Sequence, residues 1–202
     1  MSGVWYARVG TVEGGLRLAT GIDGDEHPDG TVVADADPTG LPWVWRTVPA
    51  ERGLLRVEVP ADAAPGSPPM WFVQLSEPKA DRPAEHLVGF PTDDFEPGTI
   101  ITRYTFATAG VHNDRQAGAV RWYRDLALVH QIYVAPDWRR RNVGTMLLHV
   151  ADAWHQANGW PGHLHSDGRR TDLGQQFVAG VRHPQRFASL TETMPPMDPA
   201  GP

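Results

Sequence analysis

The sequence has no cysteine and no excess of basic charge, and each absence excludes a class of protein. Without cysteine there can be no disulfide, no thiolate nucleophile and no zinc–thiolate site. The balance of 18 basic against 24 acidic residues, a formal charge of -6, argues against a general binder of nucleic acid or membranes. No segment approaches a membrane span, and Met1–Tyr6 lacks the features of a signal peptide. We therefore expect a cytoplasmic protein.

Glycine and proline are abundant, at 21 and 19 residues, and they predict many turns, especially in the first part of the chain. Residues 1–78 are expected to form a β-rich segment of short strands, among them 4–12, 16–19, 31–34, 43–48, 54–59 and 70–75. Residues 79–190 are expected to form a more regular α/β core. Residues 191–202, which include Met-Pro-Pro-Met-Asp-Pro, are expected to be a disordered tail.

Within the core, the residue patterns predict an ordered series of elements. Residues 99–107 form a β-rich run, and 117–124 and 126–134 are expected to pair as antiparallel strands around Asp125. Residues 143–157 have apolar side chains at helical spacing, and Pro161 stops that pattern. A short strand over 162–165 and a second helix over 170–181, beginning at Thr171 or Asp172, complete the series.

The segment 134–145, Val-Ala-Pro-Asp-Trp-Arg-Arg-Arg-Asn-Val-Gly-Thr, lies between a predicted strand and a predicted helix. The first turn of a helix leaves backbone N–H groups unpaired, and the helix dipole adds partial positive charge there. A phosphate or pyrophosphate fits such a position. Three consecutive arginines, Arg139, Arg140 and Arg141, add formal charge and forked donors. The segment therefore predicts an anion-binding site.

This segment resembles the acyl-CoA-binding motif of the GNAT superfamily of N-acetyltransferases, Arg/Gln-x-x-Gly-x-Gly/Ala. Arg139 occupies the first position and Gly144 the last, whereas Asn142 replaces the first glycine. Asparagine tolerates a positive φ better than most residues, so the substitution weakens the match only mildly. The resemblance implies a GNAT-like mixed central sheet with flanking helices, preceded by the β-rich N-terminal segment. The acyl-CoA contacts that it implies involve Ile132, Tyr133, Val134, Arg139, Arg140, Arg141, Asn142, Val143, Gly144 and Thr145.

The same resemblance implies an acetyl transfer from acetyl-CoA, or another acyl-CoA, to an amine, with no metal. The family often has a glutamate base four residues before the position of Val134, where this chain has His130. In a regular strand, Gln131 would point to the opposite face. The family's acid is often a tyrosine on the later helix, but no tyrosine follows Tyr133. Ser166, another acid or water would have to protonate the leaving thiolate.

Other candidate sites are weaker. His149, His155, His163 and His165 could suggest a metal site, but 149 and 155 face different sides of a helix and no carboxylate partner is evident. The acidic stretch 23–29 does not match a calcium loop. Trp43 and Trp45 are expected to pack in the core, with an acceptor platform as the alternative.

Two hypotheses of function follow. The first is an N-acyltransferase that acts on a small-molecule or peptide amine, with neither nucleic acid nor membrane as a partner; a homo-oligomer is compatible with the sequence. The second is a GNAT-like binding or structural module of an assembly, such as a phage or operon-encoded complex. The missing tyrosine and the irregular first part of the chain favour the second hypothesis, and the intact basic loop favours the first.

Overall fold

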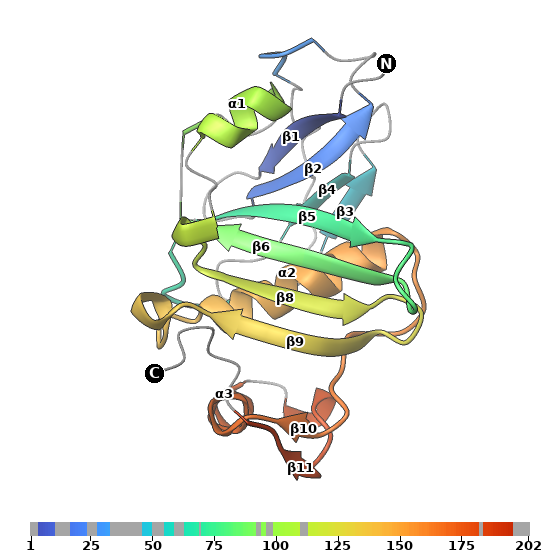
Figure 1. Ribbon diagram of the computed structural model, residues 1–202, viewed down its shortest axis with the longest axis vertical. Coiled ribbons are helices and arrows are strands. Elements are labelled where there is room, and N and C mark those ends of the chain that lie inside the picture. The colour runs from blue at the N-terminus through green and yellow to red at the C-terminus, as the bar shows by residue number, and fades with distance from the viewer. Residues whose placement is uncertain are drawn as a thin grey trace.

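The computed structural model describes residues 4–10, 17–23, 28–32, 46–49, 55–58, 63–68, 70–91, 94–95, 99–109, 113–181 and 184–195. A mixed seven-stranded sheet dominates this part of the chain (Figure 1). Its strands, in spatial order, are β7 (Ile100–Thr102), β1 (Val4–Gly10), β2 (Arg17–Asp23), β5 (Trp71–Glu77), β6 (Ala84–Phe90), β8 (Gly118–Tyr123) and β9 (Leu128–Val134). Only β2 and β5 pair in parallel; the other neighbours are antiparallel.

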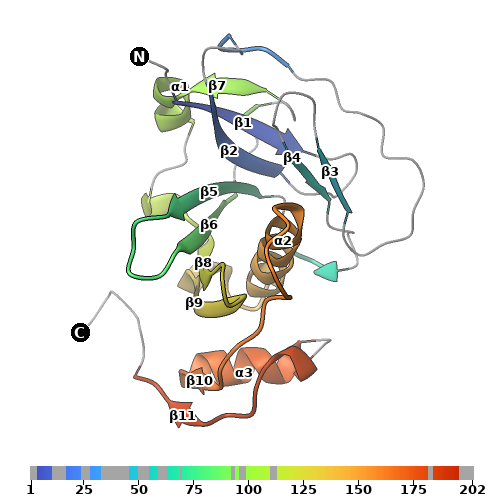
Figure 2. The same ribbon diagram turned by 90° about the vertical axis from the view of Figure 1, so that its right-hand side faces the viewer.

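Helix α2 (Val143–Ala157) packs along one face of this sheet. A separate hairpin of β3 (Arg46–Pro49) and β4 (Leu55–Glu58) contacts the same helix (Figure 2). Alternate strand residues share a face, so the α2 face carries a continuous apolar layer. Its main members are Phe72, Leu87, Val120 and Trp122 from the strands and Leu147 and Val150 from the helix. The predicted mixed α/β sheet with flanking helices is therefore confirmed.

The opposite face of the sheet is apolar at one end only. Trp71, Val73 and Phe90 form a second buried cluster there with Ile101 and Ala109, next to the short helix α1 (Arg103–Thr108). The β-rich run predicted over 99–107 is wrong from Arg103 onward. Thr102 starts a helix there because its hydroxyl accepts a hydrogen bond from the Thr105 N–H at 3.0 Å.

The C-terminal part of the described chain lies beyond the β9 edge of the sheet in both views (Figures 1 and 2). It contains β10 (Arg169–Arg170), α3 (Asp172–Gly180) and β11 (Glu192–Thr193), and β10 and β11 pair in parallel. Thr171 caps α3 by accepting from the Gly174 N–H. The prediction of a disordered tail from residue 191 is therefore wrong for Glu192 and Thr193. Residues 196–202 lie outside the described residues.

Several other predictions compare directly with the structure. Helix α2 has the predicted bounds, and the β8–β9 pair is confirmed. Strand β6 is not among the strands predicted from the sequence, although it occupies the centre of the sheet. The boundary expected at residue 78 falls inside the β5–β6 hairpin.

Residues 24–27, Trp43 and Trp45 lie outside the described residues. No helix in the described ranges is long and apolar enough to cross a membrane.

The strand predicted over 162–165 is reduced to isolated bridges at His165 and Ser166. The buried carboxylate of Asp152 accepts a hydrogen bond from the Leu164 N–H at 2.8 Å, so this N–H does not take part in a strand ladder. Pro161 and Gly162, with its φ of 79°, precede the bridge and keep the backbone irregular.

Candidate functional site

Among the described residues, none pairs with the outer edge of β9 as a strand beyond the bridge at Leu128. At its start, the Val129 N–H donates to His165 O at 2.8 Å, and the His165 N–H donates to Ala127 O at 3.0 Å. This contact is a parallel bridge between Leu128 and His165. The next residue, Ser166, instead donates its N–H to Arg186 O. The two segments therefore meet at the start of β9, and the second turns to Arg186 at Ser166.

The backbone of β9 can receive an extended ligand along this edge. The Ala135 N–H donates to the O of Ala117, the residue before β8, which fixes the alternation of the antiparallel ladder. Ile132 and Val134 therefore direct their N–H and C=O groups away from β8. Arg139 Nε donates to Val134 O at 3.1 Å, which confirms the direction of that carbonyl.

Asn142 has the left-handed backbone expected from its place in the motif, with φ 54° and ψ 18°. Its side chain does not cap α2; the amide Nδ2 donates to Pro65 O at 2.6 Å instead. The first hydrogen bond of the helix runs from the Met146 N–H to Asn142 O. The N–H groups of the three preceding residues have no carbonyl acceptor within the helix and remain suited to an anion.

The three arginines of the loop have different surroundings. Arg139 is half-buried and bound to Val134 O, as described above. Arg140 is exposed, has a positive φ of 63° and donates through NH2 to Gln176 Oε1 at 3.1 Å. Arg141 is exposed, with its guanidinium carbon 5.1 Å from the centre of the Trp138 ring. Two of the three guanidinium groups are thus accessible beside the α2 N-terminus.

Gly144 is buried and closely surrounded. A Cβ atom at this position would lie 3.1 Å from a ring carbon of Phe177 and 3.5 Å from a methyl carbon of Val134. Helix α3 thus approaches the start of α2, which the sequence did not indicate. Gly144 is required by this packing as well as by the close approach of a phosphate expected from the motif.

A β-bulge in β9 includes His130, shortly after the bridge at Leu128. Trp122 pairs with Val129 and Arg121 with Gln131, so His130 has no partner across the ladder. The His130 ring lies 5.0 Å from the ring of Tyr123, which shares the face of Arg121 and Gln131. The expectation that His130 and Gln131 point to opposite faces is therefore wrong. It assumed a regular strand, and the bulge turns both side chains to the face opposite α2.

Burial lowers the pKa of His130 below its ordinary value of 6.5, and the positive charge of Arg121 lowers this pKa further. The charge of Arg169 lowers the pKa of His130 and that of Asp167 raises it. At neutral pH the imidazole is therefore neutral and able to accept a proton.

Next to His130, the same face of the sheet carries a polar array, defined as Glu77, His86, Arg121 and Tyr123. Arg121 NH2 donates to Glu77 Oε2 at 3.0 Å, and Arg121 NH1 lies 3.4 Å from the Tyr123 hydroxyl. His86 Nε2 lies 3.0 Å from Glu77 Oε1 and 3.3 Å from Arg121 Nε. This nitrogen donates to Glu77 when it carries a hydrogen, and it accepts from Arg121 when it does not. Hydrogen bonds from Arg121 and His86 lower the pKa of Glu77 and keep it ionised.

The array was not found from the sequence, because its members come from three strands. Ala84–Phe90 does not alternate polar and apolar residues, since Glu85 and Leu87 share one face and His86 and Val88 the other, so the pattern indicated no register. Only the pairing of Leu75 with His86 and of His86 with Arg121 brings these residues into one row.

Ser166, the second catalytic candidate, is held within the C-terminal segment. Its hydroxyl accepts from Arg170 NH1 at 3.1 Å, and Arg170 also donates to Ala188 O and Gln175 Oε1. Ser166 and His130 thus lie on the two segments that meet at the Leu128–His165 bridge, but Ser166 contacts Arg170 and His130 contacts Tyr123.

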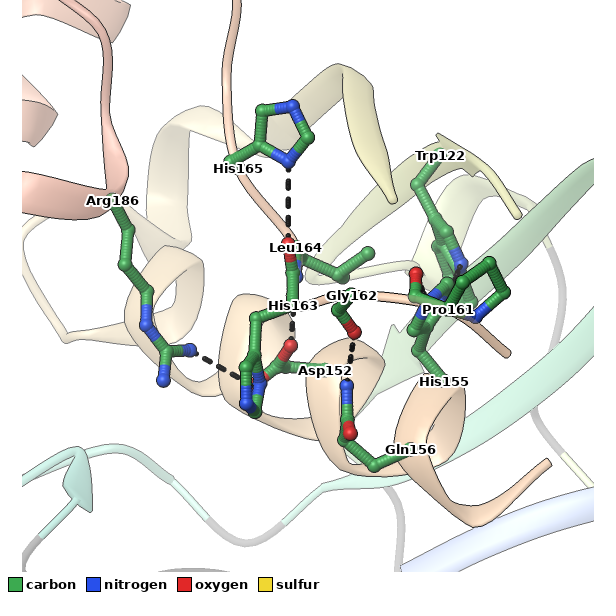
Figure 3. Close-up of polar contacts among 10 residues, drawn as sticks. All are labelled: Trp122, Asp152, His155, Gln156, Pro161, Gly162, His163, Leu164, His165 and Arg186. Carbon is green, nitrogen blue, oxygen red and sulfur yellow. Dashed lines mark hydrogen bonds and ion pairs between the residues drawn. The ribbon is translucent and has the colours of Figure 1, made fainter. Parts of the chain in front are cut away.

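The histidines near α2 have structural partners (Figure 3). The buried His155 receives the Trp122 Nε1–H at Nδ1, 3.2 Å away, and its Nε2 lies 3.0 Å from Pro161 O. His163 Nδ1 lies 3.2 Å from the buried Asp152, whose Oδ2 is also 2.8 Å from Arg186 NH1. Within the described ranges, no group of three or more metal-ligating side chains occurs. The histidines that the sequence placed close together are therefore distributed between separate hydrogen-bond networks.

Comparison with known protein families identifies one match. The model of the acetyltransferase (GNAT) family matches residues 70–167, a range that runs from β5 through β9 and α2 to the segment after the bridge. Neither the curated proteins nor the solved structures give a significant match to the chain. The match covers the β9 edge, the basic loop and the bulge, and it supports acyl-CoA-dependent acetyltransferase activity in general. With these features in one continuous segment, residues 70–167 form a domain of the acetyltransferase (GNAT) family.

Proposed function

We propose that this protein is an N-acyltransferase that transfers an acetyl group from acetyl-CoA to a primary amine by direct attack. The observation that carries the proposal is the arrangement of β9, the arginine loop and α2. The outer edge of β9 ends at Val134, and the uncapped N-terminus of α2 follows beside exposed Arg140 and Arg141. An extended arm that ends in a pyrophosphate matches this combination of backbone edge and anion site.

The pyrophosphate would be bound by backbone N–H groups from Arg140 to Thr145, with the arginines near its charge. The pantetheine arm would lie along Ile132 to Val134, pairing with the backbone as an added strand does. The residues fit such a ligand because Gly144 has no side chain to hold the phosphates away. Binding at Val134 O requires that Arg139 release this carbonyl.

For the chemical step, we propose that His130 accepts the proton of the attacking amine. Its lowered pKa favours the neutral form, and the bulge places it close to the Leu128–His165 bridge. Backbone N–H groups at the irregular part of β9 would polarise the thioester carbonyl. The proton for the leaving thiolate would come from Ser166 or from water, since α3 has no tyrosine. Without cysteine, no covalent thioester on the protein is expected.

The acceptor is proposed to be a cationic small-molecule or peptide amine in the cytoplasm. The overall charge of -6 favours the approach of a cation. Glu77 is an exposed, ionised carboxylate on the same face as His130 and would attract an ammonium group. The alternative, a GNAT-like structural module without turnover, is favoured by one observation: α3 side chains cover the start of α2.

A ligand-binding experiment separates these functions. In a thermal unfolding assay, acetyl-CoA at about one hundred times its dissociation constant should stabilise the protein by about 2.7 kcal/mol. Gly144→Glu should abolish this stabilisation through bulk and negative charge. Gly180→Glu is the matched control, because a Cβ at Gly180 has no atom within 4 Å. Thiol release with a panel of polyamines, aminoglycosides and lysine peptides would then test turnover.

The unfolding temperature of each variant without ligand shows whether Gly144→Glu still folds. If millimolar acetyl-CoA does not stabilise the native protein, the acyltransferase proposal fails and the structural module is favoured. If it stabilises the native protein and Gly144→Glu equally, the site has been assigned to the wrong residues.

A further inference from the structure

Two side chains of α3 occupy the cofactor site described above. Gln176 Oε1 accepts the hydrogen bond of Arg140 NH2 at 3.1 Å. The next residue, Phe177, lies over Gly144, where a Cβ atom would be only 3.1 Å from its ring. Consecutive residues of one short helix therefore contact both the arginine loop and the glycine of the motif.

These contacts involve the groups that a bound acyl-CoA would use, if the proposed function is correct. The amide oxygen of Gln176 bonds to Arg140 as a phosphate oxygen would, but it carries no formal charge. An ionised acceptor bonds to a guanidinium more strongly than a neutral one, so a phosphate would compete well for Arg140. The Phe177 ring lies between α3 and the start of α2, on the side where Val134 ends the outer edge of β9.

The segment that carries α3 is also attached to the middle of α2, through a residue other than Gln176 and Phe177. Arg186 NH1 lies 2.8 Å from the buried Asp152 carboxylate in the middle of α2. Phe187, the next residue, packs edge-on against Phe177 with ring centres 6.2 Å apart. Arg186 can therefore hold the segment while Gln176 and Phe177 move, because the Arg140–Gln176 bond is exposed and Phe177 is only half-buried.

We propose that Gln176 and Phe177 form a gate over the cofactor site, and that acyl-CoA binds only when both side chains leave Arg140 and Gly144. The gate rests on the proposed function, since it regulates the same site. Its thermodynamic consequence is simple: the apparent affinity is reduced by the fraction of molecules in which the gate is open. Variants that remove the gate should therefore bind acetyl-CoA more tightly than the native protein.

The first experiment is calorimetry of acetyl-CoA with the native protein, Phe177→Ala and Gln176→Ala. If the gate is open in about one molecule in ten, its removal tightens binding by about ten-fold. The association rate should rise by a similar factor, because the closed molecules cannot accept the ligand. Leu173→Ala is the matched control: it truncates an exposed side chain of the same helix and should leave the affinity unchanged.

A second measurement does not depend on how Phe177→Ala packs. Gln176→Ala truncates an exposed side chain and removes only the hydrogen bond to Arg140. The association rate of acetyl-CoA with this variant, measured by stopped flow, should exceed that of the native protein. Its unfolding temperature without ligand shows that the variant folds.

Each outcome has a distinct meaning. If the native protein binds acetyl-CoA and neither single variant binds it more tightly, the gate is overturned while the proposed function stands. Weaker binding by Phe177→Ala also overturns the gate, because the ring would then be a wall of the site. An unchanged association rate for Gln176→Ala has the same consequence. If no form binds acetyl-CoA, the cofactor assignment fails and the gate fails with it.

Discussion

The two faces of the central sheet differ in how their side chains are used. The face toward α2 is largely apolar, and its buried polar group Glu85 is hydrogen-bonded. The opposite face has an apolar cluster at one end and the polar array at the other, next to His130. The same strands therefore supply stability on one side and chemically reactive groups on the other. We therefore expect substitutions on the α2 face to lower the free energy of unfolding, and substitutions in the polar array to change the pKa of His130.

The largest effect on stability is expected for Leu147→Ala on the α2 face. Leu147 is fully buried and lies against the region of Gly89 and Gly118. The lost burial and the resulting cavity should lower the free energy of unfolding by about 2–5 kcal/mol. The matched substitution on the other face, Leu75→Ala, concerns a half-exposed side chain and should change it by about 0.5 kcal/mol or less. Urea unfolding of both variants measures the difference, and equal losses would contradict the comparison.

A smaller effect is expected for Trp122→Phe. This change removes the N–H that bonds to His155 Nδ1 in the core and leaves a buried acceptor unpaired. Such a group costs about 1–3 kcal/mol, measured as a loss of unfolding free energy. The adjacent Tyr123→Phe removes a half-exposed hydroxyl from the opposite face and should cost about 0.5 kcal/mol or less. A larger loss for Tyr123→Phe would show that the polar array is itself a stabilising element.

The smallest effect on stability, but a specific one on titration, is expected for Arg121→Gln. Removal of this positive charge should raise the pKa of His130 toward 6.5, although burial, the larger cause, still holds it below that value. Because the pKa of folded His130 is depressed, its contribution to stability is present above the unfolded pKa and is lost as the pH falls. The Arg121→Gln variant should therefore lose less of the stability contributed by His130 when the pH falls.

An NMR titration of the His130 ring measures this pKa directly. Lys79→Gln is the matched control, because it removes an exposed positive charge that is not among the causes of the His130 shift. If the pKa of His130 is unchanged in Arg121→Gln, the charge of the polar array does not influence the proposed base.

The order of elements around the motif could be predicted from the sequence because local residues determine it. Asn142 adopts the left-handed conformation expected from its chemistry, and the apolar spacing of 143–157 gives a helix with the predicted bounds. Helix α1 and strand β6 were missed for related reasons. The Thr102 cap overrides a β-rich composition, and the centre of the sheet is specified by partners distant in sequence.

The sequence by itself determined the strand, the basic loop and the helix N-terminus that are predicted to form the anion site, because these depend on neighbouring residues and backbone preferences. Only the tertiary structure decided which side chains surround that site. The register of β5, β6 and β8 places Glu77 and His86 beside Arg121, and the bulge turns His130 to the face of Tyr123. The packing of α3 places Phe177 on Gly144. These contacts join residues far apart in the chain, and no local preference can specify them.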